Sequence, residues 1–76
     1  MESMVENKVS QIEMPQISLA SARVNAKLTQ DEAAIKLKVS RATVFNWENG
    51  KSAPDAKMFR RIGELYKIPT DYIFLP

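Results

Sequence analysis

The sequence predicts an all-α protein, a compact bundle of five short helices. From Ile17 onward, apolar residues recur three and four positions apart, which is the spacing of amphipathic helices. Ser, Thr or Asp residues stand directly before these stretches, where helix caps are favoured. No stretch shows the alternation that is typical of strands, and no internal repeat is present. We therefore expect a helical domain without a sheet.

Ser18 is the expected cap of the first helix. The residues of that helix that share one face are Leu19, Ala22, Arg23 and Ala26. The stretch TQDE, Thr29 to Glu32, is a capping box, in which the Thr side chain bonds the amide three residues on and the Glu side chain reaches back. It opens a short second helix whose inward residues are Ala33, Ala34 and Leu37.

Ser40 caps the third expected helix, which ends near Gly50, a residue suited to a left-handed stop. After the loop KSAPD, Asp55 caps a fourth helix with a wide apolar stripe. The stripe consists of Met58, Phe59, Ile62, Leu65 and Tyr66. Pro69 breaks the chain, and the last stretch, TDYIFLP, is expected to form a short helix or turn.

Composition excludes several kinds of function. The 76 residues leave room for one domain, and they include neither Cys nor His. Disulfides, thiolate metal sites and the commonest general base are therefore ruled out, and we expect no enzyme, no metal and no cofactor. No apolar run approaches the ~20 residues of a membrane span and no signal peptide is seen, so we expect a cytoplasmic protein without a membrane partner.

Charge divides the chain into two parts. Residues 1–16 carry three Glu and one Lys, whereas residues 17–76 carry ten Lys or Arg and six Asp or Glu. The first part has no sustained period and is closed by Pro15, so we predict a flexible N-terminal arm over residues 1–16. Residues 17–76 form the predicted domain, and their basic balance favours a polyanionic partner.

The stretch VSRATVFNWENGK has two unlike faces. Val39, Val44 and Trp47 form an apolar face, with Trp47 expected in the core. The opposite face bears short polar groups and Phe45 instead of the usual Lys and Glu. The small Ala34 permits the preceding helix to cross at close range, near a right angle, so that the start of the third helix points outward.

The side chains on that outward face suit base recognition. Arg can bond guanine O6 and N7 through two donors, Asn can pair with adenine, and Ala or Phe can pack on a thymine methyl group. Short side chains also allow the backbone to approach the floor of a groove. We therefore interpret this face as one that reads DNA bases.

The run from Ser18 to Leu75 resembles the phage repressor/Cro-type helix-turn-helix family, also called the XRE family. The stretches that carry the resemblance are SLASARVNAKLTQDEAA, VSRATVFNWENGKSAP and IPTDYIF. The resemblance implies a five-helix, lambda-repressor-like fold in which the second and third helices form the reading unit. It also implies a module that binds operator DNA, usually as a dimer.

The resemblance further implies roles for single residues. It implies base contacts by Ser40, Arg41, Ala42 and Asn46, with Phe45 facing outward beside them. It implies phosphate contacts by Gln30, Thr43, Asn49 and Lys51. Arg23 and Glu48 match a structural ion pair between the first and third helices.

Two positions depart from the family pattern. Lys38 stands in the turn where Gly is usual, so a left-handed Lys is expected there, at a cost on the order of 1 kcal/mol. The loop KSAPD lacks the extra Arg or Lys that some relatives send into the minor groove. Minor-groove readout by this loop is therefore not expected.

On these grounds we expect a sequence-specific DNA-binding transcriptional regulator, Cro-like in size or a bare repressor head, that binds a palindromic operator through the third helix. The expected partner is double-stranded operator DNA, and no small-molecule ligand is expected. A weak homodimer, cooperative on DNA, is expected to form through the apolar C-terminal residues Tyr72, Ile73, Phe74 and Leu75. The alternative is a protein-interaction module of the same fold, such as an antitoxin whose main partner is another protein, with the acidic residues 1–16 as its contact.

Overall fold

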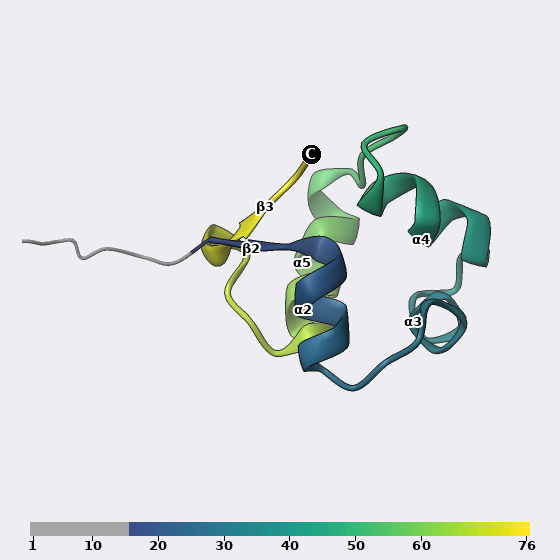
Figure 1. Cartoon of the computed structure of the whole chain (residues 1–76), viewed down its shortest axis with the longest axis horizontal. Coiled ribbons are helices and arrows are strands. Elements are labelled where there is room, and N and C mark those ends of the chain that lie inside the picture. The colour runs from purple at the N-terminus through teal and green to yellow at the C-terminus, as the bar shows by residue number, and fades with distance from the viewer. Residues whose placement is uncertain (1–15) are drawn as a thin grey trace, which may run out of the picture.

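A computed structural model describes residues 16–76 of the chain (Figure 1). The elements in order are β2 (Ile17–Ser18), α2 (Leu19–Asn25), α3 (Gln30–Leu37), α4 (Arg41–Glu48), α5 (Ala56–Tyr66), the 3-10 turn η1 (Thr70–Tyr72) and β3 (Ile73–Phe74). The helical fold class is confirmed, but the count of five helices is not: residues 16–76 contain four α-helices. The expected arm over residues 1–16 lies outside the described residues, apart from Gln16.

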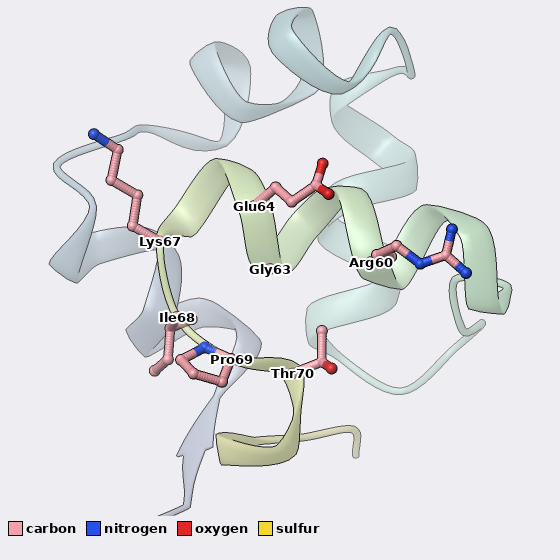
Figure 2. Close-up of a pocket in the computed structure, with 7 residues that line it drawn as sticks. All are labelled: Arg60, Gly63, Glu64, Lys67, Ile68, Pro69 and Thr70. Carbon is pink, nitrogen blue, oxygen red and sulfur yellow. The ribbon is translucent and has the colours of Figure 1, made fainter.

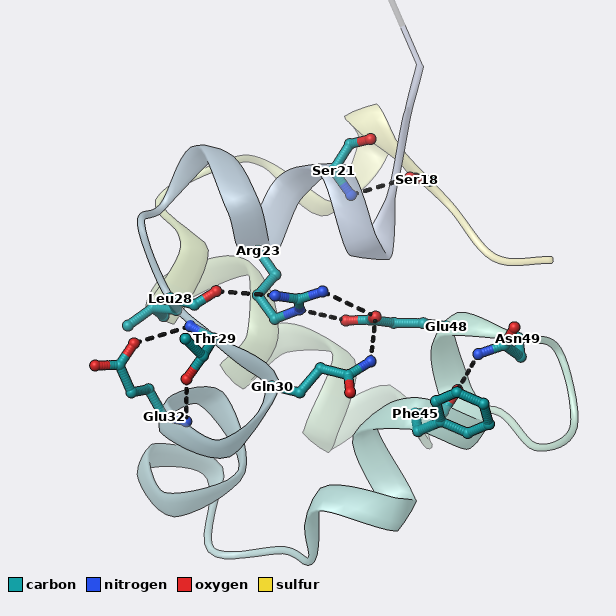
Figure 3. Close-up of polar contacts among 10 residues, drawn as sticks. All are labelled: Ser18, Ser21, Arg23, Leu28, Thr29, Gln30, Glu32, Phe45, Glu48 and Asn49. Carbon is teal, nitrogen blue, oxygen red and sulfur yellow. Dashed lines mark hydrogen bonds and ion pairs between the residues drawn. The ribbon is translucent and has the colours of Figure 1, made fainter.

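The α-helices begin where the sequence indicates. Ser18, Thr29, Ser40 and Asp55 are the N-caps, and the side chain of each accepts a hydrogen bond from the backbone N–H three residues on. The capping box at α3 is complete: Glu32 N donates to Thr29 Oγ1 at 3.1 Å, and Thr29 N donates to Glu32 Oε1 at 2.8 Å (Figure 3). The bond from the Thr29 backbone lowers the pKa of the Glu32 carboxyl, because it stabilises the ionised form.

Lysine residues occupy left-handed conformations at helix ends. Lys27, Lys38 and Lys67 have φ angles of 64°, 62° and 59°. Lys38 is the C-cap of α3, as expected, and the N–H of the next residue, Val39, returns to Ala34 O at 3.0 Å. The turn between α3 and α4 is therefore a closed, hydrogen-bonded structure in which a non-glycine residue holds the left-handed position.

One apolar core joins the four helices. Its buried residues are Leu19, Ala22, Ala33, Ala34, Leu37, Val44, Trp47, Ile62, Tyr66 and Ile73. The prediction that Trp47 belongs to the core is confirmed, with 7% of the residue exposed. Ala33 and Ala34 are both buried, and their small side chains allow α3 and α4 to pack closely.

The two ends of the domain are paired. β2 and β3 run parallel, with Ile17 opposite Ile73 and Ser18 opposite Phe74 (Figure 1). Gln16 Nε2 also donates to Asp71 O at 3.0 Å. The expectation of no strand was therefore wrong, because two residues are too few to show an alternating pattern. The pairing helps to bring Ile73 into the core, where only 6% of it is exposed.

Gly63 permits the segment after α5 to fold back on that helix. A Cβ at Gly63 would lie 2.8 Å from Thr70 Cγ2 and 3.1 Å from Ile68 O. An open hollow of about 340 Å³ lies beside this contact (Figure 2). Its lining residues are Arg60, Gly63, Glu64, Lys67, Ile68, Pro69 and Thr70. All of them belong to α5 and the segment that follows it, so this hollow is separate from the helix pair α3–α4.

Residues 16–76 include no helix with the length and apolar character needed to cross a bilayer. The same residues contain no group of three carboxylates placed to hold a metal ion.

Candidate nucleic-acid interface

Helix α4 has a buried side and an outward side. Val44 and Trp47 point into the core, while Arg41, Ala42 and Phe45 are exposed. Phe45 is 46% exposed, which is high for an aromatic residue. Ser40, at the N-cap, is also exposed, and Asn46 is half-buried. The outward side thus presents the residues that the sequence singled out for base contact.

A shallow hollow connects this side of α4 to the start of α3. It measures about 370 Å³ and is lined by Gln30, Arg41, Ala42 and Phe45. The structure therefore brings Gln30, which was expected at a phosphate, next to three of the residues expected at bases. Because Ala42 and Phe45 contribute carbon atoms and Gln30 and Arg41 contribute polar atoms, the hollow has both apolar and hydrogen-bonding character.

A partly buried ion pair lies behind this surface. Arg23 Nε lies 2.7 Å from Glu48 Oε2, and Arg23 Nη2 donates to Glu48 Oε1 at 3.2 Å (Figure 3). The side chains of Arg23 and Glu48 are only 13% and 6% exposed. Arg23 Nη1 also donates to Leu28 O at 2.9 Å, so the guanidinium ties α2 to the next loop as well as to α4. The hydrogen bond to Glu48 raises the pKa of Arg23.

Gln30 is the third member of this network. Its Nε2 donates to Glu48 Oε1 at 3.0 Å (Figure 3). A carboxylate only accepts hydrogen bonds, so the amide nitrogen of Gln30 must face Glu48. Among residues 16–76, the carbonyl oxygen and the second N–H of the amide form no further hydrogen bond. Sequence reasoning missed this bond, because Gln30 and Glu48 are brought together only by the crossing of α3 and α4.

Two residues expected at phosphates also stabilise the ends of α4. Thr43 N donates to Ser40 Oγ at 3.0 Å, and the two hydroxyl oxygens lie 2.8 Å apart. Asn49 Nδ2 donates to Phe45 O at 2.8 Å, and the same carbonyl accepts from the backbone N–H of Asn49 at 3.0 Å. Lys51 is exposed just beyond Gly50, whose φ is 74°. The backbone N–H of Lys51 donates to Asn46 O at 2.9 Å and so closes the end of α4, while its side chain is exposed.

Asp31 contributes an unexpected negative charge to the same surface. Its Oδ1 lies 3.6 Å from Arg41 Nε, and the side chains of Asp31 and Arg41 are 70% and 67% exposed. Asp31 lies in the first turn of α3. No local pattern links it to Arg41, since the contact depends on the angle between two helices.

The comparisons with known proteins agree with this geometry. Residues 19–73 match a family model described as Helix-turn-helix. Over 55 residues the chain is 36% identical to the HTH-type transcriptional regulator ImmR of Bacillus subtilis (strain 168). The aligned residues make up 72% of this chain and 43% of that relative. The chain thus matches less than half the length of that relative.

No solved structure matches the chain significantly. The family match nevertheless spans all four α-helices and the turn between α3 and α4. The chain therefore belongs to the XRE-type helix-turn-helix family of DNA-binding transcription regulators.

Proposed function

We propose that this protein is a sequence-specific transcriptional regulator that binds a palindromic DNA operator through α4, in the cytoplasm of a prokaryotic or phage-infected cell. The observation that carries the proposal is the outward side of α4. It exposes Arg41, Ala42 and Phe45 beside the start of α3, on a helix anchored from behind by Glu48. This combination of a rigid helix and short, chemically varied side chains suits insertion into a major groove.

Base recognition is assigned to Ser40, Arg41, Ala42, Phe45 and Asn46. Arg41 offers paired donors to guanine, and Asn46 offers a donor and an acceptor to adenine. Ala42 and Phe45 offer carbon surface to a thymine methyl group. Each type of contact distinguishes one base from another, so this group would determine sequence preference.

Phosphate contact is assigned to Gln30, Thr43, Asn49 and Lys51. Gln30 is the first residue of α3, where free backbone N–H groups favour an anion, and its second amide N–H is available. Lys51 is an exposed cation next to the end of α4. Contacts of this kind fix the position of the protein on the duplex without reading sequence.

Dimeric binding is part of the proposal. One α4 of 8 residues can reach only a few base pairs, whereas two copies related by a two-fold axis would read an inverted repeat. Phe74 and Leu75 are 45% and 38% exposed and could contribute to the contact between copies. Ile73 is buried in the core and is unavailable for this purpose.

Selection of bound duplexes from a random pool, followed by sequencing, tests the proposal. Arg41→Ala should weaken binding to the selected site by about 1–3 kcal/mol and relax the preference at one base position. Lys51→Ala should weaken binding to all sequences alike and reduce the salt slope by about 1. Failure of the wild-type protein to enrich any sequence would contradict the proposed function, and an unchanged consensus with Arg41→Ala would contradict reading by α4.

A further inference from the structure

We infer that Asp31 is a positioning residue for Arg41, and that it makes the reading of guanine by α4 stricter. The inference rests on the proposed function and adds a residue to it. Asp31 lies in the first turn of α3 and Arg41 is the first residue of α4, so their contact bridges the two helices of the motif.

The geometry explains what the contact would do. The contact joins Asp31 Oδ1 to Arg41 Nε at 3.6 Å, so the carboxylate lies on the Nε side of the guanidinium. A guanidinium is planar and presents its donors along two edges. With the carboxylate on the Nε side, the edge formed by Nη1 and Nη2 is left for O6 and N7 of guanine.

In free solution the contact is a weak restraint. Both side chains are largely exposed, and exposed ion pairs are screened by water and salt. Entry of α4 into a groove would displace water from the pair, and the attraction between the two charges would then increase. Asp31 would therefore orient Arg41 most strongly in the complex with DNA.

The carboxylate also has a second, opposite effect. On a surface that faces DNA, a negative charge is repelled by phosphates, so Asp31 would lower the affinity for every sequence. Only where Arg41 meets guanine would better orientation compensate for this repulsion. The two effects together widen the gap between the preferred site and other DNA.

A purely structural role for Asp31 predicts a different outcome. An acidic residue in the first turn of a helix favours the helix through its dipole, as Asp31 would in α3. Its removal would then alter the melting temperature and leave base preference unchanged. Base preference is therefore the measurement that separates the two roles.

The experiment compares Asp31→Asn and Asp31→Ser with Asp71→Asn, which removes an exposed carboxylate from η1. Fluorescence anisotropy would measure three duplexes: the selected site, the same site with guanine replaced at the position that depends on Arg41, and an unrelated sequence. Thermal melting would verify that each variant is folded.

Both Asp31 variants should bind the unrelated duplex more tightly, and their preference for guanine should fall about twofold to fivefold, the range of an exposed ion pair. Asp71→Asn should leave the preference for guanine unchanged. In an Arg41→Ala background, Asp31→Asn should no longer alter base preference. If the Asp31 variants kept the full preference for guanine, the positioning role of Asp31 would be wrong and the proposed function would still stand. If the wild-type protein selected no duplex, the proposed function would be wrong as well.

Discussion

The ion pair between Arg23 and Glu48 connects α2 to α4 through single side chains, and Gln30 adds α3 to the connection. Glu48→Ala would leave the Arg23 guanidinium partly buried without its counter-charge, so we expect a loss of about 3–5 kcal/mol in the free energy of unfolding. Glu64 is exposed on α5, and Glu64→Ala should change that free energy by less than about 0.5 kcal/mol. Urea denaturation of the two variants measures the difference, and equal midpoints would show that the pair has no such role.

Tyr66 provides a pH-dependent test of the same region. Burial, and then the charge of Glu48, raises the pKa of Tyr66 from 10.0 to about 12. The phenol therefore ionises at lower pH in the unfolded chain than in the folded protein. The free energy of unfolding should keep the full contribution of this group below pH 10 and lose it as the pH rises from 10.0 to about 12.

Tyr66→Phe removes the ionisable group. The free energy of unfolding of this variant should therefore fall less steeply over this pH range than that of the wild-type protein. Every other ionisable group is common to the two proteins, so the difference between the two curves isolates Tyr66. Parallel curves would indicate that Tyr66 titrates normally.

Some side-chain contacts of the site could be predicted from the sequence, and others could not. The positions of Arg23 and Glu48 followed from the family pattern, because that pattern fixes both spacings. The bond from Gln30 to Glu48 and the contact from Asp31 to Arg41 did not, since each depends on how α3 and α4 cross and on the side-chain rotamers there. Contacts across two elements have no local signature in the chain.

At the scale of elements, the end of α3 has a lysine in a left-handed conformation that glycine adopts more easily. Lys38 has a φ of 62°, a conformation that favours glycine. We expect Lys38→Gly to stabilise the protein by about 1 kcal/mol. Lys36, within the last turn of α3, is the matched control, and Lys36→Gly should destabilise by about 1 kcal/mol. Chemical denaturation should give shifts of opposite sign for these two variants, and a shared sign would contradict the explanation.

The helix starts could be predicted, whereas the strand pair could not. A cap is a local structure of four residues, and Ser18, Thr29, Ser40 and Asp55 each form theirs within one turn. The pairing of β2 with β3 joins residues from opposite ends of the domain. Its stability comes from the closure of the whole fold. The short helix or turn expected over TDYIFLP is therefore present at Thr70–Tyr72, whereas the strand at Ile73–Phe74 was not expected.

At the scale of the whole molecule, the proposed dimer makes a prediction about stoichiometry. The exposed apolar surface of Phe74 and Leu75 is small, so we expect a monomer or a weak dimer in dilute solution. On DNA we expect two copies bound cooperatively, with half-site centres about 34 Å or 10 base pairs apart. Analytical ultracentrifugation with a selected duplex measures this, and one protein per non-palindromic site at saturation would refute the dimeric model.

The parallel pairing of β2 and β3 has a consequence for the folding pathway. Helices α3 and α4 are adjacent along the chain and can associate early, at a small entropic cost of loop closure. Ile17 and Ile73, by contrast, meet only after nearly the entire described chain has been ordered between them. We therefore expect the pair to form after the transition state, so that Ile73→Val accelerates unfolding and leaves the refolding rate nearly unchanged in stopped-flow experiments. A slower refolding rate in that variant would place the closure of the two ends in the folding nucleus.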